Sequence, residues 1–398
     1  MPSAIVVGAG IFGASVAHRL AADGWEVTLI ECDEPAGPRS SSGSHSRLIR
    51  YGHGDDVWHA QLARRARECW RAIESATGTA LLTECGLLWM AHREDGWEAR
   101  SERVLREAGI PVERLSADEA ARMFPSFDAA GVEFAVFEPE AGALRAQLAV
   151  HTLVTLAREH GAQLIGGTAL PQGDGVRVRE RRLEADHVVW ACGPWLPALF
   201  PGIAEIRVDR VEYATFECDP AWRADNGVPA WVDFDADVYG LPALDGEGFK
   251  VAPEGAAEPF DPDTFPRPLT AAREAAAREY VALRFPSLAT ARRVGGRVCQ
   301  YEMTADSEFL IAPHPEHAGV WLLGGGSGHG FKHGPALAEM VRDLLTGAAQ
   351  PLERHAAGPR SRGPLLTLGL GGDRSSADGE PARSGDTDAA TTIEPGLV

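Results

Sequence analysis

A glycine turn near the N-terminus restricts the fold of this chain more than any other stretch does. The apolar run A-I-V-V is followed at once by G-A-G-I-F-G, and then by a helical stretch of small residues that ends near Gly24. A second apolar run, W-E-V-T-L-I-E, ends in Glu31. Glycines at such a turn let the backbone approach a pyrophosphate at the helix N-terminus, and the acid accepts hydrogen bonds from ribose hydroxyls. The order of strand, turn, helix, strand and acid predicts a Rossmann-like unit that binds a dinucleotide through Gly8, Gly10, Ile11, Phe12, Gly13 and Glu31.

Composition limits what kind of protein this chain can be. Its 398 residues, 44% of them hydrophobic, are enough for about two domains. The N-terminus lacks a basic segment ahead of an apolar stretch, and no run reaches the roughly eighteen apolar residues of a membrane span, so we expect a cytoplasmic protein without a membrane partner. A formal net charge of −19 disfavours binding to nucleic acid, which needs clustered Lys and Arg. Because the overall charge also repels anions, local cations must hold any anionic substrate. The six cysteines lie far apart, and no histidines cluster at metal-ligand spacing, so free thiols and no metal site are expected.

The remaining patterns divide the chain into helical and strand-like parts. Helices are predicted over 56–78, 98–109, 270–283 and 334–346, and Ser116 with Glu119 forms a capping-box pattern. Strand-like stretches at 205–218, 229–240 and 247–252 indicate a separate antiparallel sheet. From 358 onward Gly, Ser, Asp, Pro and Arg dominate, which is typical of a disordered tail.

The segment H-V-V-W-A-C-G-P-W (187–195) has two readings. It is an apolar strand that ends in small residues and Gly193, as expected where a chain returns to the first sheet and passes the bound nucleotide. Nicotinamide enzymes do not usually need such a return. An ordinary core strand remains an equal alternative.

Together these motifs resemble a known family of flavoproteins that oxidise amines. It includes D-amino-acid oxidase and glycine oxidase, and the resemblance is nearest to its branch of monomeric sarcosine oxidase and N-methyltryptophan oxidase. The likeness spans about residues 3–357 and includes the motifs G-S-H-S-R-L-I-R (43–50), Y-G-L-P (239–242), G-E-G-F-K (246–250), V-C-Q-Y (298–301), H-P-E-H (314–317) and S-G-H-G-F-K (327–332).

The resemblance implies an α/β fold in which a Rossmann-like FAD-binding domain is interleaved with an antiparallel-sheet substrate domain. The expected FAD-binding domain is discontinuous and takes residues 1–85, 145–204 and 290–357. Residues 86–144 and 205–289 are assigned to the substrate-binding domain, and 358–398 to the tail.

The same resemblance implies how FAD is held. Cys299 corresponds to a cysteine that forms a thioether with the 8α-methyl of the flavin, although a lone strand cysteine is otherwise a core residue. The glycine-rich loop with Gly328, His329, Gly330, Phe331 and Lys332 would lie against the flavin ring. The dipole of the helix that begins near Gly334, together with the Lys332 ammonium, should stabilise a reduced, anionic flavin. A flexible glycine linker is the alternative for this loop.

Further site residues follow from the motif at 43–50. Ser44 and Arg47 are expected beside the flavin, and Arg50 is expected to pair with the substrate carboxylate together with Lys332, because a guanidinium matches a carboxylate bidentately. Two surface arginines are the alternative. His45 is also placed at the site, but this loop is two residues shorter than the family pattern G-S-H-H-G-D-T-R, so its counterpart is left open.

Lys250, Tyr239 and Tyr301 complete the expected catalytic set. The resemblance places Lys250 at the position of a lysine that activates O₂ near flavin N5, since a fixed cation stabilises developing superoxide. Tyr239 and Tyr301 match tyrosines on the substrate side, with core or rim tyrosines as the alternative. Glu254 stands where sarcosine oxidase has a histidine. A carboxylate there would favour a substrate with a second positive group, or would repel sarcosine itself. The alternative is that the loop V-A-P-E-G is simply rearranged.

These implications together predict an FAD-dependent oxidase of a secondary, N-methyl or cyclic amino acid. Hydride passes from the carbon beside nitrogen to FAD, the imine hydrolyses, and O₂ is reduced to H₂O₂. The expected partners are a small amino acid and O₂, and the expected state is a monomer. The alternatives are a primary amino acid oxidase of the glycine oxidase type, a dehydrogenase that uses another electron acceptor, and a non-catalytic flavoprotein.

Overall fold

One half of the molecule is built on a six-stranded, mainly parallel sheet. In the computed structural model, which describes residues 1–361, its order is β19-β20-β13-β1-β2-β9, and only the edge strand β19 is antiparallel. Every interior position of β1 is buried, as expected of a strand covered on both faces. The strands are β1 (Ser3–Val7), β2 (Glu26–Glu31), β9 (Gln163–Gly166), β13 (His187–Trp190), β19 (Leu310–Pro313) and β20 (Val320–Gly324).

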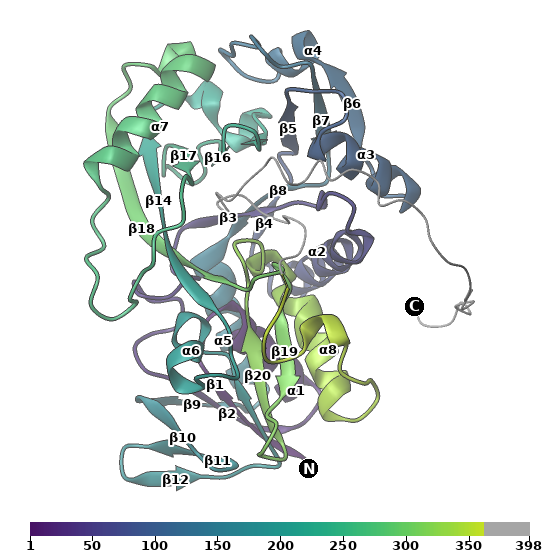
Figure 1. Cartoon of the computed structure of the whole chain (residues 1–398), viewed down its shortest axis with the longest axis vertical. Coiled ribbons are helices and arrows are strands. Elements are labelled where there is room, and N and C mark those ends of the chain that lie inside the picture. The colour runs from purple at the N-terminus through teal and green to yellow at the C-terminus, as the bar shows by residue number, and fades with distance from the viewer. Residues whose placement is uncertain (362–398) are drawn as a thin grey trace.

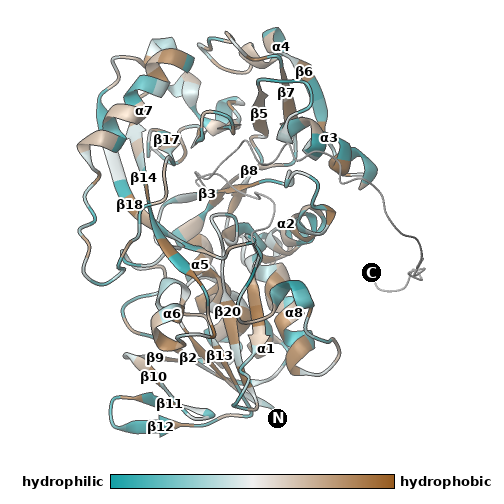
Figure 2. Cartoon of the chain, in the orientation of Figure 1, coloured by the Kyte–Doolittle hydropathy of each residue, from teal (hydrophilic) through white to brown (hydrophobic). Residues whose placement is uncertain are grey.

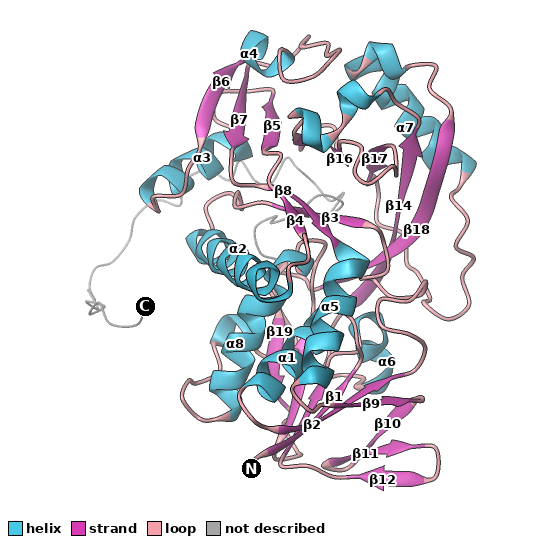
Figure 3. Ribbon diagram, turned by 180° about the vertical axis from the view of Figure 1, so that it is seen from behind, coloured by secondary structure: helices cyan, strands magenta, loops and turns pink. Residues whose placement is uncertain are grey.

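Helices cover one face of this sheet, and a small sheet covers the other. Four helices, α1, α2, α5 and α8, pack their apolar side chains against alternate residues of β1 and β2. Figure 3 shows these helices in front of the strands. The other face packs against α6 (Leu196–Leu199) and a three-stranded sheet. The helices are α1 (Ile11–Ala22), α2 (Val57–Thr77), α5 (Ala146–Glu159) and α8 (Gly334–Leu345), and the small sheet is β10 (Ala169–Gln172), β11 (Gly175–Val178) and β12 (Arg181–Leu183). Figure 2 shows apolar residues concentrated in the central strands.

The other half contains an eight-stranded sheet in the order β18-β14-β17-β16-β15-β5-β7-β6, antiparallel except where β15 meets β5. α7 (Ala271–Arg284) packs on one face and α3 (Trp97–Glu107) on the other. α4 (Ala117–Ala121) begins with the predicted capping box of Ser116 and Glu119. The strands are β5 (Leu87–Ala91), β6 (Glu113–Ser116), β7 (Phe134–Glu138), β14 (Arg207–Phe216), β15 (Ala230–Asp233), β16 (Val238–Leu241), β17 (Phe249–Pro253) and β18 (Arg293–Met303).

The prediction of one strand-like stretch over 229–240 was wrong in detail. β15 and β16 are the two arms of an antiparallel hairpin, and Asp237 in the turn has φ 59°. Aspartate adopts this left-handed conformation more readily than most residues do, so the turn needs no glycine. The helices predicted at 56–78, 98–109, 270–283 and 334–346 are confirmed, with ends that differ by one or two residues.

A third sheet lies between the two halves, as Figure 1 shows. It consists of β3 (Ser46–Ile49), β8 (Gly142–Arg145) and β4 (Leu82–Thr83) in the order β3-β8-β4. β18 pairs with β14 along its length, so residues 293–303 belong to the eight-stranded sheet, although the expected boundary at 290 would give them to the FAD-binding domain. The domain boundaries stay a prediction.

Near the end of the described chain, Arg360 pairs with Asp306 and donates to the Phe309 carbonyl, so the packed chain continues beyond 358. The rest of the expected tail, 362–398, lies outside the described residues. No helix within residues 1–361 combines the length and apolar character needed to cross a bilayer.

Candidate active site

The glycine turn after β1 forms one wall of a large cavity. Gly8 has φ 97°, and a Cβ there would lie 2.5 Å from the Ala191 oxygen. A Cβ on Gly13 would lie 1.8 Å from the Gly8 oxygen, so only glycine lets α1 approach β1 this closely. The cavity holds about 450 Å³ and is lined by Gly8, Gly10, Ile11, Phe12 and Glu31, among others. The N-terminus of α1 therefore opens toward space that suits a pyrophosphate.

Residues far along the chain complete this cavity. The segment predicted to return to the first sheet does so: β13 lies parallel beside β1, and Gly193 with φ 53° lines the cavity. At the end of β2, Glu31 accepts hydrogen bonds from the backbone nitrogens of Ala9, at 2.7 Å, and of Asp33. This anchored carboxylate, the glycine turn and the volume together fit the adenosine and pyrophosphate portions of a dinucleotide.

A second cavity of about 50 Å³ lies where the two halves of the molecule meet. Residues far apart in the sequence line it, from the β3 segment, the eight-stranded sheet and the loop between β20 and α8. Most of the residues predicted at the flavin and the substrate are among them: Arg47, Arg50, Tyr239, Glu254, Tyr301, Gly328, His329, Phe331 and Lys332. The structure therefore assembles most of the predicted substrate and flavin-ring residues in one place.

The glycine-rich loop connects this cavity to the nucleotide turn. A Cβ on Gly330 would lie 2.8 Å from the Phe12 ring, so the loop packs against the start of α1. The loop is also tied to β18, because Glu302 accepts from the Gly325 nitrogen and the Ser327 nitrogen donates to the Glu302 carbonyl. This anchoring argues for an ordered loop and against a flexible linker.

Cys299 is buried on β18 among basic side chains. The Arg47 guanidinium donates a hydrogen bond to its sulfur at 3.3 Å. Burial raises the pKa of the Cys299 thiol, but Arg47, Arg297 and Lys250 outweigh it, so the pKa lies below its ordinary value. A buried cysteine that only fills the core has no such surroundings, and a low thiol pKa favours the reactive thiolate.

Lys250 on β17 lies beside a third, smaller cavity. Its ammonium donates to the Ser46 carbonyl at 3.2 Å and lies 4.2 Å from the centre of the Tyr213 ring. Burial, reinforced by Arg47, lowers the pKa of Lys250 to about 7. A surface lysine on a strand, the alternative reading, would not be buried in this way.

The third cavity also places His45 and Ser44. His45 lines it, but the ring is partly exposed and lies 3.3 Å from Asp245 and 3.8 Å from Glu247. It does not line the second cavity. Ser44 is buried, and its hydroxyl donates to the Ser46 carbonyl at 3.2 Å. The structure thus puts His45 behind Lys250 rather than among the residues that would face a substrate.

Arg50 is held by groups that its sequence motif does not include. The guanidinium lies 5.3 Å from the centre of the Trp89 ring and donates to the Gly52 carbonyl. The fully buried Glu138 accepts hydrogen bonds from the backbone nitrogens of Tyr51 and Gly52 and from the Trp89 indole. Burial lowers the pKa of Arg50 to about 10, against the opposing charge of Glu138.

Lys332 reaches the second cavity from η5 (Phe331–His333) and is almost fully buried. Its ammonium donates to the His329 carbonyl at 2.8 Å, and its own carbonyl accepts from the Trp70 indole. Burial, and next the charge of Arg50, hold the pKa of Lys332 well below its usual range. Two buried cations that disfavour each other line a cavity that can receive an anion.

Glu254 faces the second cavity from the loop after β17. One carboxylate oxygen accepts from the Tyr301 hydroxyl at 2.7 Å, and the other has no hydrogen-bond partner among the described residues. Burial raises the pKa of Glu254 to about 8, although the Tyr301 hydrogen bond opposes this. Glu254 follows β17 directly, its backbone nitrogen donates to the Asp237 carbonyl at 2.9 Å, and its side chain lines the second cavity.

Sequence reasoning missed several residues of this arrangement. Ser42 accepts from the Ile11 nitrogen at 3.0 Å and so caps the start of α1, and Glu138 and Trp89 position Arg50. Ser42 stands only two residues before the predicted Ser44, so the motif pointed to the right loop. No sequence signal links Glu138 to Arg50. The pairing of β5 with β7 brings Glu138 near Trp89, and the chain that follows β3 reaches it through the backbone nitrogens of Tyr51 and Gly52.

Comparisons with known proteins agree with this geometry. Residues 3–344 match the family model described as DAO, FAD dependent oxidoreductase. The monomeric sarcosine oxidase of Streptomyces avermitilis is 31% identical over 365 residues, 87% of this chain and 95% of that enzyme. The N-methyl-L-tryptophan oxidase of Yersinia pestis is 26% identical over 360 residues, 88% of this chain and 96% of that enzyme.

Solved structures share the fold. The L-proline dehydrogenase of P. horikoshii superposes with a TM-score of 0.77 at 23% identity, covering 89% of this chain and 95% of that one. The iminodiacetate oxidase of Chelativorans sp. BNC1 gives 0.76 at 22% identity, covering 90% of this chain and 100% of that one. With the family match over most of its length, and with relatives that oxidise amino-group donors over most of theirs, this chain belongs to the DAO family of FAD-dependent oxidoreductases and is an FAD-dependent enzyme that oxidises amino-group donors.

Proposed function

We propose that the enzyme is an oxidase of a secondary, N-methyl or cyclic amino acid, with O₂ as electron acceptor and H₂O₂ as product. The observation that carries this proposal is the meeting of Arg50, Lys332 and Glu254 around one small cavity. Two cations suit a carboxylate, and one carboxylate suits the amine. Relatives over most of the chain are named for sarcosine and N-methyl-L-tryptophan, both N-methylated amino acids.

The carboxylate end of the substrate would bind at Arg50 and Lys332. Both side chains are buried, and burial lowers both pKa values. A bound carboxylate would stabilise the charged forms of both side chains, and it would accept bidentate hydrogen bonds from the guanidinium. Because Trp89 and the Glu138 hydrogen bonds already position the Arg50 segment, little ordering is left for the substrate to induce.

The amine end would lie toward Glu254 and the two tyrosines. Glu254 keeps one oxygen without a partner, and Tyr301 holds the other. This oxygen can accept a hydrogen bond from a substrate ammonium. Glu254 therefore favours a substrate whose amine is protonated when it binds, or one that carries a second N–H group besides the reacting amine.

The chemistry needs only positioning and charge from the protein. Bound FAD supplies the acceptor for the hydride that leaves the carbon beside nitrogen. Arg50 and Lys332 orient that carbon, and Glu254 takes or holds a proton at the amine, after which water hydrolyses the imine. Lys250 lies near Arg47 and 5.9 Å from the centre of the Tyr239 ring, and both of these residues line the second cavity. From there its ammonium would stabilise the negative charge that develops on O₂.

The proposal includes a covalent link between Cys299 and the 8α-methyl of FAD. Cys299 is buried, and its sulfur lies 3.3 Å from the Arg47 guanidinium and 3.8 Å from the carbonyl of Ser41, which line the second and the first cavity respectively. Its lowered pKa favours the thiolate that such a bond requires. A monomeric, cytoplasmic enzyme completes the proposal.

Acid denaturation of the purified yellow protein tests the cofactor link. Colour that stays with the wild-type chain but separates from a Cys299→Ala variant supports the thioether. Colour released from the wild type as well as from the variant refutes it. A panel of N-methyl, cyclic and primary amino acids with peroxide detection tests the substrate class. Reaction only with primary amino acids would favour a glycine oxidase type. Bleaching by secondary amino acids with slow reoxidation in air would indicate a dehydrogenase.

A further inference from the structure

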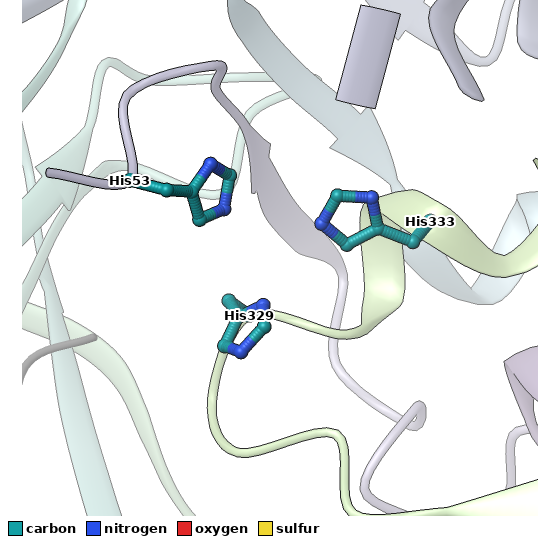
Figure 4. A group of neighbouring side chains, drawn as sticks. All are labelled: His53, His329 and His333. Atoms are coloured by element: carbon teal, nitrogen blue, oxygen red, sulfur yellow. The ribbon is translucent and has the colours of Figure 1, made fainter. Parts of the chain in front are cut away.

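A cluster of buried histidines adjoins the second cavity, which His329 itself lines. His53 comes from the loop between β3 and α2, while His329 and His333 flank Lys332 in the chain, and Figure 4 shows the three rings facing one another. All three are at most 4% exposed. Their ring centres lie 5.6 to 5.9 Å apart. The sequence predicted no metal site, because the fold alone brings His53 to the other two.

Backbone carbonyls fix the protons on two of these rings. His53 Nδ1 lies 2.8 Å from the Tyr51 carbonyl, and His329 Nε2 lies 2.9 Å from the Ser307 carbonyl. A carbonyl only accepts, so each of these nitrogens carries the proton. The other nitrogen of each ring, His53 Nε2 and His329 Nδ1, is then a bare lone pair.

These lone pairs have no protein partner. Neither nitrogen has a hydrogen-bond donor among residues 1–361, and the same holds for both nitrogens of His333. Buried polar atoms are almost always satisfied, so three converging orphans indicate a missing ligand. Metal-bound histidines characteristically donate their second N–H to a backbone carbonyl or a carboxylate, which is the arrangement at His53 and His329.

The geometry fits a small cation. One nitrogen from each ring lies within 4.8 Å of the other two. Two nitrogens on a tetrahedral Zn²⁺ lie about 3.4 Å apart, given a Zn–N distance of about 2.1 Å, so modest side-chain rotation closes the site.

The surrounding charges are mixed. Lys332 and Arg50 oppose a cation, whereas Asp56 and Glu308 lie just beyond His59, at 3.2 and 3.8 Å from its ring nitrogens. Those two carboxylates and His59 also lie close enough together for a metal. However, both carboxylates already pair with Arg354, so they supply a negative field rather than free ligands.

We propose that His53, His329 and His333 bind one divalent transition-metal ion of the class that imidazole nitrogen prefers, such as Zn²⁺. Three protein ligands leave a fourth position for water. The ion would join the β3–α2 loop, through His53, to two points on either side of Lys332, His329 in the loop before η5 and His333 at its end. It would so hold the lysine that lines the second cavity. A single buried water bridging the three nitrogens is the rival occupant.

Metal analysis of the tag-free holoenzyme is the test. We expect about one equivalent of metal per chain, either as purified or after incubation with Zn²⁺ and gel filtration, and loss of it in His53→Phe and in His333→Phe, which keep an aromatic ring in each place. The matched control is the double variant His314→Gln/His317→Gln, which removes a partly exposed pair whose rings lie 4.6 Å apart. The control should retain the metal.

Two outcomes overturn the proposal. Wild-type enzyme that holds no metal under either condition would leave water as the occupant, and a His333→Phe variant with unchanged metal content would place the ion elsewhere. If the variants fail to fold, anomalous diffraction at the zinc edge from Zn²⁺-incubated wild-type crystals gives the answer directly. A peak among the three rings supports the site, and no peak there refutes it.

Discussion

Arg50 shows how the fold fixes a buried cation beside the second cavity before any ligand binds. Its ring contact with Trp89 and the Glu138 hydrogen bonds to the adjacent backbone leave the guanidinium few alternative positions. The cost is a buried charge, visible in the lowered pKa of about 10. At the proposed carboxylate site, a substrate carboxylate would offset that cost, so the binding energy would be concentrated at one end of the ligand.

Replacing Arg50 should therefore weaken catalysis strongly. For Arg50→Met we expect kcat/KM to fall by about 100- to 1000-fold, mainly through KM, because truncating one partner of a buried charge pair costs roughly 3–4 kcal/mol. Arg50→Lys should recover only part of this, since lysine lacks the bidentate fork. Arg64→Met, at an exposed position on α2, is the control and should behave as wild type. An unchanged KM in Arg50→Met would remove Arg50 from the carboxylate site.

Lys250 should act on the oxidative half-reaction alone. In Lys250→Met, anaerobic reduction by substrate should proceed within a few-fold of wild type, while reoxidation by O₂ should slow by about 100- to 1000-fold, the usual effect of removing one fixed electrostatic group. Stopped-flow measurement of the two half-reactions separates these effects. Equal slowing of both would show that Lys250 acts structurally.

Glu254 should give the pH profile an ionisation that a glutamine variant lacks. Its pKa is raised to about 8, so the group is neutral below this pH and becomes a carboxylate above it. A cationic amine is attracted only by the carboxylate, so kcat/KM should rise as pH increases through about 8. In Glu254→Gln that rise should disappear, while the ionisation of the substrate amine, common to both enzymes, remains. Identical profiles would contradict the role in amine recognition.

Elements explain which parts of this site could be predicted from sequence. The 187–195 segment was left open between a return to the first sheet and an ordinary core strand, and its pairing with β1 shows the return. The glycine turn and Glu31 were predictable because each lies at the end of one strand of a single sheet, where local pattern decides position. The 229–240 hairpin was not, because its turn at Asp237 lacks the glycine or proline that usually marks one. The histidine cluster depends on packing of loops far apart in sequence, which no local pattern contains.

The start of α1 has no room for a side chain at Gly13. In Gly13→Ala the new methyl group would lie 1.8 Å from the Gly8 oxygen, so α1 must move away from β1 and the dinucleotide cavity must deform. We expect purified Gly13→Ala to contain less than a tenth of the wild-type FAD, measured by absorbance. Gly166→Ala, at the end of β9, meets no atom within 4 Å and should bind FAD normally. Full FAD content in Gly13→Ala would mean that the turn is not the pyrophosphate site.

At the scale of the molecule, the cofactor would join its two halves. The nucleotide cavity belongs to the six-stranded sheet, whereas Cys299 and Tyr301 come from β18 of the eight-stranded sheet, and Glu302 of the same strand lines the nucleotide cavity. β14 and β18 extend from one half toward the other in Figure 1, so the expected covalent bond would lie on the longest strand pair that connects them. A group held from both sides should stabilise the whole chain and not one domain alone.

Thermal unfolding can test this coupling. Flavin-depleted Cys299→Ala should unfold in a single transition. Its midpoint temperature should rise with added FAD, by roughly 4 °C at 100 times the dissociation constant, since binding then contributes about 2.7 kcal/mol. Wild-type enzyme, with its flavin attached, should show no response to free FAD. Two separate transitions in the depleted variant, with only one of them shifted by FAD, would instead mean that the halves unfold independently and that the cofactor stabilises the six-stranded sheet alone.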